Sequence, residues 1–400
     1  MLKEWFAKQK AKGILLKAFK VANLGIPHKT GEDKFYQYPK IHEVSFNYEK
    51  KYMRYTFTLP NGVDPKEVKK KQFVFQQFFG NNIEITGDIK HFVLNVYTKN
   101  LPTTIKYKYE DIKSLIEKDK IIVPIVAGYD RKGELTIYDA TGSPNLLIFG
   151  EPGGGKSSIL HVIHTTLMQL YSPEEMHFYM GDMKMAELPV YEGVKHVKSI
   201  SYTGKELAPT LTYLRKELEK RGKILKKHRV RHVNSLPVKV KKDLPYIMLT
   251  VDEFVMIKDN SIITELLQVA SLGRAYGMYV ILSMQRPSHS ILSTDVRALL
   301  SVRMGFKTVD KKNAVLGETP GSELLEEPGT FIFKKSDTKQ LKAPYLNESA
   351  VEKIIRPYID EEWRNHSYLE EQGLSEQKET HEYIEEDIFS TEKVNIDGFK

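Results

Sequence analysis

The feature that most constrains the fold is a glycine-rich octapeptide that lies between an apolar run and a stretch with helical periodicity. It matches the P-loop pattern G-x-x-x-x-G-K-[ST], and its residues are Gly150, Glu151, Pro152, Gly153, Gly154, Gly155, Lys156 and Ser157. The apolar run 145–149 has the length of a strand, and residues 157–170 have helical periodicity. Backbone N–H groups of such a loop, together with the helix N-terminus, favour a bound anion. A glycine-rich turn that matches by chance is the alternative.

The motif predicts ATP and Mg²⁺ as ligands. The expected ATP contacts are the eight motif residues and Ser158. Lys156 would reach the β- and γ-phosphates, and Ser157 would hold Mg²⁺.

Two further apolar strands end in polar residues that suit the same chemistry. Residues 246–251 are followed by Asp252-Glu253, a Walker B pattern in which Asp252 binds the Mg²⁺ shell and Glu253 polarises the attacking water as a general base. Residues 278–283 lead to Met284 and Gln285, and Gln285 would sense the γ-phosphate or orient water. An exposed charged turn and an ordinary loop residue are the alternative interpretations.

Strand-like and helical patterns alternate over most of the chain, which predicts an α/β fold with a mostly parallel sheet. The short apolar runs lie at 146–149, 177–180, 246–251, 278–283 and 302–306. A smaller α/β unit precedes them. We expect a basic helical segment at 1–39, a small α/β domain at 40–108, a linker at 109–127, an ATPase domain at 128–345 and an acidic tail at 346–400.

Composition bears on the cellular compartment of the chain and on the charge of its partner. There is no cysteine, and no apolar run approaches the ~20 residues that span a bilayer, so we expect a cytoplasmic protein without a membrane span. Residues 346–400 contain 15 acidic and 6 basic residues although the whole chain carries +8, so the preceding part is strongly basic. Such a part favours a polyanionic partner.

Arginines are candidates for the cation that accelerates phosphoryl transfer by ~10³–10⁵ in related chemistry. We consider Arg215, Arg221, Arg274 and Arg286, for each of which a surface salt bridge is the alternative. The stretch from Arg215 to Lys242 is rich in lysine and arginine with little aromatic interleaving, which suits contact with a phosphate backbone. A plain solvated helix is the alternative there.

With these residues in place, the chain resembles the motor domain of FtsK/SpoIIIE DNA translocases, in the FtsK–HerA branch of RecA-like ATPases. The resemblance covers about residues 128–333. It rests on the P-loop and on four further segments that follow the family's order: 181–188 (GDMKMAEL), 214–221, 230–234, and 273–288 with Gly273-Arg274-Ala275 and Gln285-Arg286-Pro287-Ser288.

The resemblance implies a RecA-like fold, ATP hydrolysis coupled to DNA translocation, and a homohexameric ring around double-stranded DNA. A short member of this kind is similar to ATPases of conjugative plasmids, integrative elements or phages, for which a relaxase or other mobile-element proteins are candidate partners. A type VII-like protein-secretion ATPase and a nucleotide-switched DNA-binding scaffold are the alternatives.

Overall fold

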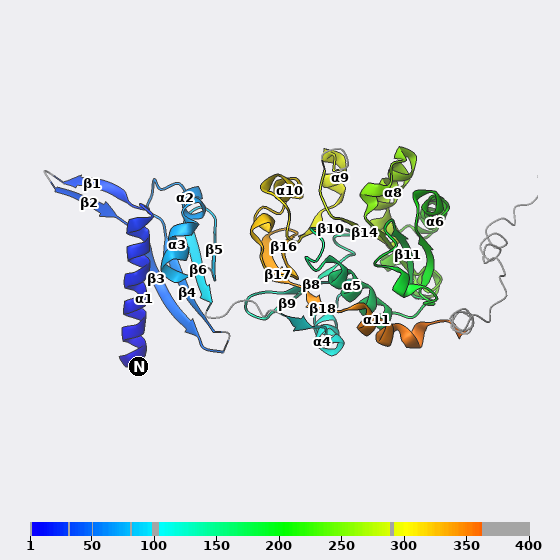
Figure 1. The fold of residues 1–400 in the computed structure, drawn as a ribbon, viewed down its shortest axis with the longest axis horizontal. Helices are drawn as coiled ribbons and strands as arrows, with labels where there is room; N and C mark the ends of the chain where they lie inside the picture. Colours follow the sequence, from blue (N-terminus) through cyan, green and yellow to red (C-terminus); the bar gives the residue numbers. More distant parts are fainter. Residues whose placement is uncertain are drawn as a thin grey trace, which may run out of the picture.

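The computed structural model describes residues 2–30, 33–49, 51–80, 82–97, 104–288 and 292–361. These residues form a smaller N-terminal group of elements and a larger group built around one long sheet (Figure 1). Among the described residues, no helix has both the length and the apolar character needed to cross a bilayer.

The N-terminal group is an antiparallel sheet covered by helices. Its strand order is β3-β4-β6-β5, and a separate hairpin of β1 and β2 adjoins it. Its elements are α1 (Leu2–Val21), β1 (Ile26–Thr30), β2 (Asp33–Gln37), β3 (Lys40–Asn47), β4 (Tyr52–Thr58), α2 (Lys66–Lys70), α3 (Gln72–Phe79), β5 (Ile83–Gly87) and β6 (His91–Tyr97). Leu15 and Phe19 of α1 lie in the same buried cluster as Tyr55, Phe57 and Phe75. The helix and the sheet therefore share one core.

The larger group is built on a ten-stranded sheet with the order β12-β11-β13-β14-β10-β15-β16-β17-β8-β9. The first six strands in this order are parallel, and the remaining pairs are antiparallel. The strands are β8 (Pro124–Tyr129), β9 (Leu135–Asp139), β10 (Asn145–Phe149), β11 (Met176–Asp182), β12 (Val197–Ser201), β13 (Tyr246–Asp252), β14 (Met278–Met284), β15 (Val302–Gly305), β16 (Thr330–Lys334) and β17 (Thr338–Lys342). The predicted α/β class with a mostly parallel sheet is confirmed. The antiparallel extension was not predicted.

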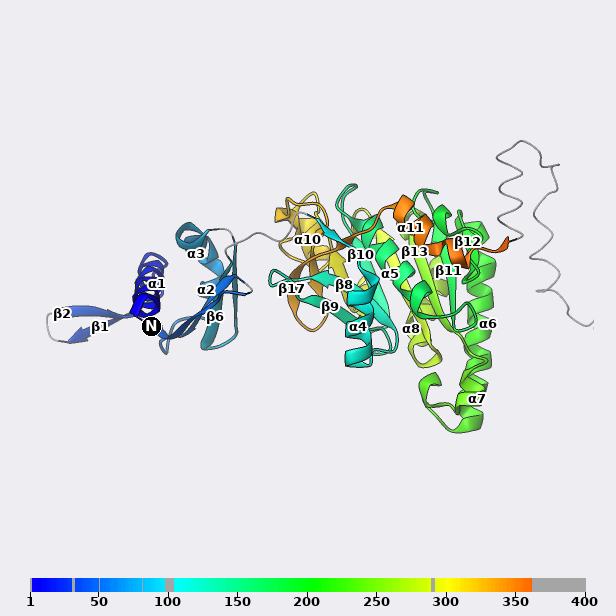
Figure 2. The same ribbon diagram turned by 90° about the horizontal axis from the view of Figure 1, so that it is seen from below.

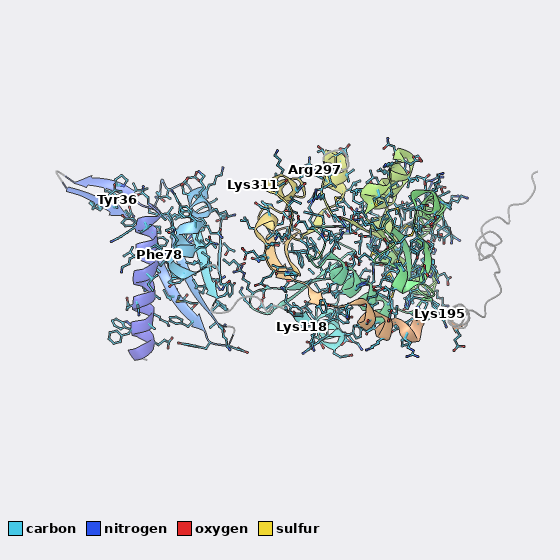
Figure 3. The ribbon with its side chains drawn as sticks, in the orientation of Figure 1. Tyr36, Phe78, Lys118, Lys195, Arg297 and Lys311 are labelled. Atoms are coloured by element: carbon cyan, nitrogen blue, oxygen red, sulfur yellow. The ribbon has the colours of Figure 1, made fainter. Side chains whose placement is uncertain are left out.

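Helices cover both faces of this sheet (Figures 1 and 2). The short strands β7 (Ile105–Lys106) and β18 (Pro344–Tyr345) pair beside it. The helices are α4 (Tyr109–Asp119), α5 (Lys156–Leu170), α6 (Gly204–His228), α7 (Val238–Lys241), α8 (Asn260–Leu272), α9 (Thr294–Leu299), α10 (Lys311–Leu316) and α11 (Glu348–Ile355). Charged side chains such as Lys118, Lys195 and Lys311 lie on the outside (Figure 3).

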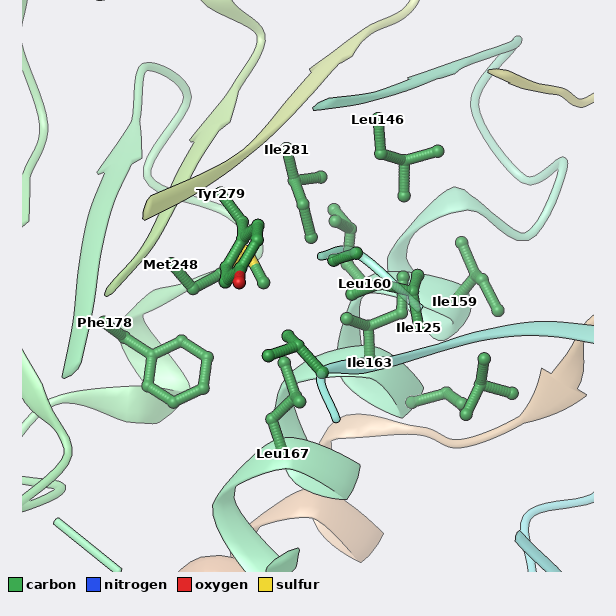
Figure 4. Close-up of a cluster of buried hydrophobic side chains, with 14 of the residues drawn as sticks. Ile125, Leu146, Ile159, Leu160, Ile163, Leu167, Phe178, Met248, Tyr279 and Ile281 are labelled. Atoms are coloured by element: carbon green, nitrogen blue, oxygen red, sulfur yellow. The ribbon is translucent and has the colours of Figure 1, made fainter. Parts of the chain in front are cut away.

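The side chains of β10 pack alternately against the helices on the two faces of the sheet. Leu146 and Ile148 pack with α5 in one buried cluster, part of which Figure 4 shows. Leu147 and Phe149 belong to the second cluster, which α6 and α8 cover. Because successive side chains of a strand point to opposite faces, a strand buried on both sides becomes a continuous apolar run. This is the pattern from which the sequence predicted the strand.

Packing suggests different domain limits from those predicted. Ile112 and Ile116 of α4 lie in the core of the larger sheet, although they fall in the predicted linker. Val351 and Ile355 of α11 lie in the same core, although they fall in the predicted tail. We therefore propose that residues 2–97 form one domain and residues 104–361 the other. The tail beyond residue 361 lies outside the described residues.

Candidate nucleotide site

The glycine-rich loop joins β10 to α5 in a conformation that its glycines permit. Gly150 has φ 149° and Gly155 has φ 107°, values that L side chains rarely adopt. A Cβ on Gly150 would lie 2.5 Å from Cβ of Phe306, and one on Gly155 would lie 2.7 Å from Cα of Gly329. A side chain at either position would therefore displace the loop. Helix α5 begins at Lys156 directly after the loop.

A cavity of about 520 Å³ opens beside this loop. It is lined by residues from the loop and α5, from the segment after β11, from the ends of β13 and β14, and from the start of α11. These are Glu151, Pro152, Gly153, Gly155, Lys156, Ser157, Ser158, His161, Lys184, Ala186, Glu187, Asp252, Gln285, Tyr345, Leu346, Asn347 and Glu348. The carboxyl ends of parallel strands are where open α/β sheets bind ligands.

Lys156 lies between the two acidic residues that end β13. Its side chain is buried, and its Nζ is 3.8 Å from Oδ1 of Asp252 and 3.8 Å from Oε2 of Glu253. Ser283 near the end of β14 donates a hydrogen bond to Asp252. The backbone N–H of Gln285 donates to Oε1 of Glu253 at 3.1 Å. The structure thus brings together the residues that the sequence predicted from three separate strand ends.

The segment after β11 adds contacts that the sequence did not predict. The buried carboxylate of Asp182 accepts four backbone N–H bonds, which come from Lys184, Ala186, Glu187 and Leu188. The fold of this segment places Nζ of Lys184 2.9 Å from Oε2 of Glu253. It also allows Ser157 to donate to Oε1 of Glu187 at 2.6 Å. Burial raises the pKa of Glu187, and the Ser157 bond opposes this.

The chain that follows β18 is attached to the first turn of α5. The Oγ atom of Ser158 donates to the carbonyl of Pro344 at 3.0 Å and accepts from the N–H of Leu346 at 2.7 Å. Ser158 was predicted as an ATP contact. It lines the cavity, but these two bonds already engage its hydroxyl group.

The predicted arginines do not gather at the cavity. Arg221 is buried, its Nε donates to Glu217 at 2.9 Å, and its Nη1 donates to the carbonyl of Tyr276 at 2.7 Å. Because Tyr276 precedes β14, this pair lies at the amino edge of the parallel strands, away from the P-loop. A side chain buried in such a pair cannot reach a nucleotide. Arg221 is thus a structural residue, and its assignment as a catalytic candidate is wrong.

The other three arginines are more accessible than Arg221. Arg274 donates to the carbonyl of Thr141 at 3.0 Å, also at the amino edge because Thr141 precedes β10. Arg215 lies 3.6 Å from Glu219 on α6. Arg286 is exposed and follows Gln285, which lines the cavity. Of these three arginines, Arg286 is the one that directly follows a residue of the cavity lining.

Two histidines of α5 are held uncharged next to the cavity. His161 bonds Tyr191 Oη at 2.9 Å through Nδ1, and His164 bonds Thr250 Oγ1 at 2.9 Å through Nε2. Burial lowers the pKa of His161 to about 4 and that of His164 to about 3. Because the pKa of His164 is lower in the folded than in the unfolded chain, uncharged His164 contributes stability above the unfolded pKa of 6.5. This contribution is lost as the pH falls below that value.

We therefore expect acid to destabilise this part of the fold through His164. Between pH 7 and pH 5 the unfolded chain takes up a proton that folded His164 does not, which costs about 2 kcal/mol of unfolding free energy. Urea unfolding followed by circular dichroism at both pH values measures the loss. The His164→Gln variant retains a polar group and cannot titrate, so its stability should fall by that much less. An equal fall in both proteins would contradict the prediction.

The chain matches known proteins over the part that carries this cavity. Residues 113–289 match the FtsK/SpoIIIE family. The chain is 31% identical over 296 residues to a DNA translocase FtsK of Rickettsia prowazekii, and 29% identical over 259 residues to one of Leptospira interrogans. These matches cover 62% and 61% of this chain but 40% and 27% of the relatives' own lengths.

Solved structures share the fold. The pCW3 conjugation coupling protein TcpA, determined as a monomer with ATPγS, has a TM-score of 0.55 at 20% identity, covering 80% of this chain and 94% of TcpA. Part of EssC from Geobacillus thermodenitrificans has a TM-score of 0.54 at 18% identity, covering 70% of this chain and 54% of EssC. These likenesses show that the larger group of elements has the RecA-like fold of P-loop ATPases.

Oxygen donors at the cavity suit Mg²⁺. The hydroxyl of Ser157 and the carboxylates of Asp252 and Glu187 are ligands of the type that this hard cation prefers. In the part of the chain that the structure describes, no cluster of three or more His, Cys, Asp or Glu could hold a metal. This donor set fits a metal that is brought largely by nucleotide phosphates, as is usual for Mg²⁺.

Proposed function

We propose that the chain is an ATP-driven DNA translocase whose FtsK/SpoIIIE domain hydrolyses ATP at the cavity beside the P-loop. The observation that carries this proposal is that Lys156, Ser157 and Asp252 line one cavity, while Glu253 lies behind them with its Oε2 atom 3.8 Å from Nζ of Lys156. A phosphate loop, an oxygen donor set for Mg²⁺ and a carboxylate base are the parts that ATP hydrolysis requires.

Each residue then has a chemical role. Lys156 contacts the β- and γ-phosphates, and the loop N–H groups surround them. Ser157 and Asp252 hold Mg²⁺, which would supply charge neutralisation at the phosphates. Glu253 accepts a proton from the attacking water, and the neighbouring Gln285 orients that water or contacts the terminal phosphate. Glu187, which accepts a hydrogen bond from Ser157, would offer a second carboxylate to the metal.

Double-stranded DNA is the proposed polymer because exposed cations gather on α6 and the segment after it. Helix α6 and the short α7 extend beyond the rest of the domain (Figure 2). The exposed cations of this extension are Lys216, Lys220, Lys223, Lys226, Lys227, Arg229, Arg231, Lys239 and Lys242. Cations without a specific base-reading geometry suit phosphate contacts, which position a protein on DNA without reading its sequence.

We propose further that the active form is a homohexamer around the duplex, with Arg215, Arg274 or Arg286 supplying a cation to a neighbouring subunit. The name of TcpA, a conjugation coupling protein, supports a role in transfer of a mobile element. In that role a relaxase or another mobile-element protein would be the partner. The names of the relatives, DNA translocase FtsK, support translocation on DNA.

A triplex-displacement assay tests this function. The purified chain, duplex DNA bearing a third strand, ATP and Mg²⁺ should release the third strand, and the duplex should stimulate ATP hydrolysis. Hydrolysis stimulated by DNA without displacement would instead favour a nucleotide-switched scaffold. If DNA had no effect on hydrolysis and a protein substrate stimulated it, the result would favour a secretion ATPase. The EccC and EssC structures share the fold of this chain.

A further inference from the structure

Lys184 is a second lysine at the cavity, and the roles assigned above do not use it. Its Nζ is 2.9 Å from Oε2 of Glu253, whereas Nζ of Lys156 is 3.8 Å from the same oxygen. Two lysines therefore share one carboxylate oxygen of the proposed general base. The side chain of Lys184 is 32% exposed, so its four-carbon stem has room to move.

The position of Lys184 is built into the fold. Asp182, which ends β11, accepts the N–H of Lys184 at 3.1 Å and those of Ala186, Glu187 and Leu188 at 2.8 to 2.9 Å. A carboxylate that accepts several N–H bonds fixes the backbone around it. The backbone of Lys184 is thus fixed, whereas its side chain can move. That side chain lines the same cavity as Glu187 and Gln285.

Nucleotide binding changes the charge balance around this lysine. When Lys156 turns to the phosphates, Glu253 loses one of its two cations. The terminal phosphate then lies near a carboxylate of the same sign, because Glu253 must reach a water that attacks that phosphate. Like charges at such a separation repel unless a cation lies between them. Lys184 already pairs with Glu253 and lines the same cavity as the P-loop residues Lys156 and Ser157.

We propose that Lys184 is a γ-phosphate contact that bridges the terminal phosphate of bound ATP to Glu253. In the structure it pairs with Glu253. With ATP bound it shares its donors between carboxylate and phosphate, which leaves Glu253 a free lone pair for water. ADP has no group at that place. This inference rests on the proposed ATPase function and adds a cation supplied by the same subunit.

Nucleotide affinities of the full chain test the inference without relying on catalysis. Calorimetric titration with ATPγS and with ADP, each with Mg²⁺, should show that Lys184→Met lowers the affinity for ATPγS by about 10-fold, as expected for one lost charge-assisted hydrogen bond. The affinity for ADP should not change. Lys184→Arg should recover most of the ATPγS affinity. Lys258→Met, an exposed lysine outside the cavity lining, is the matched control.

The other results separate the possible failures. An equal loss for both nucleotides would overturn the inference, because it would indicate that Lys184 maintains the loop. Unchanged affinity for both would overturn it as well, since the lysine would then serve Glu253 alone. If the unaltered chain bound neither nucleotide, the proposed function itself would fail. Circular dichroism of each variant verifies that the fold is retained.

Discussion

Replacing Lys156 with alanine should abolish measurable ATP hydrolysis. The variant removes the cation nearest to the phosphates, and loss of one preorganised charge contact commonly lowers a turnover rate by ~10²–10³. It also removes a buried cation 3.8 Å from Asp252 and from Glu253. Glu253 keeps Lys184 at 2.9 Å and Asp252 keeps the hydrogen bond from Ser283, so the loss of stability should be smaller than the ~3–5 kcal/mol that an uncompensated buried charge costs.

The assay for Lys156→Ala is phosphate release with and without duplex DNA. Lys307→Ala is a suitable control because Lys307 is exposed and meets the P-loop through its backbone carbonyl, which accepts the N–H of Glu151 at 2.8 Å. Saturating ATP should not rescue the Lys156 variant. Hydrolysis at the unaltered rate would refute the assignment of the P-loop.

Glu253→Gln should separate nucleotide binding from hydrolysis. The amide is isosteric with the carboxylate and can still accept the N–H of Gln285, but it cannot take a proton from water at neutral pH. Loss of a general base lowers the rate by ~10²–10⁴. The P-loop contacts are untouched, so ATPγS should still bind with an affinity within a few-fold of the original.

The measurement for Glu253→Gln pairs single-turnover hydrolysis with nucleotide titration. Glu174→Gln changes an exposed carboxylate before β11 and should leave both unaffected. Turnover close to that of the unaltered chain would remove Glu253 from its role. Loss of ATPγS binding together with turnover would show that the Lys184–Glu253 pair is needed for the shape of the cavity.

The sequence predicted those parts of the site that depend on a single strand and on the residues directly after it. Apolar runs predicted β10, β13 and β14, and polar residues at their ends predicted which side chains meet at one edge of the sheet. Parallel strand geometry makes that step reliable because it requires no knowledge of loops. The hairpin of β16 and β17 was missed because its second strand, Thr338-Lys339-Gln340-Leu341-Lys342, is mostly polar.

Contacts between segments could not be predicted in this way. The Lys184–Glu253 and Ser157–Glu187 pairs depend on how Asp182 folds the loop after β11, and no local pattern reveals this. Other signals were present in the sequence. Glu217 precedes Arg221 by one helical turn, the spacing of an ion pair. Apolar residues of α1 recur at helical spacing, as in Ala11, Leu15 and Ala18, which predicts a face packed in a core.

The two hydrogen bonds of Ser158 have a mechanical consequence. They join the first turn of the P-loop helix to Pro344 and Leu346, directly before α11. A shift of that turn when triphosphate is exchanged for diphosphate would pass to α11 without an intervening flexible joint. We therefore expect a fluorescent label on α11 to report the exchange of nucleotide at the cavity beside the P-loop.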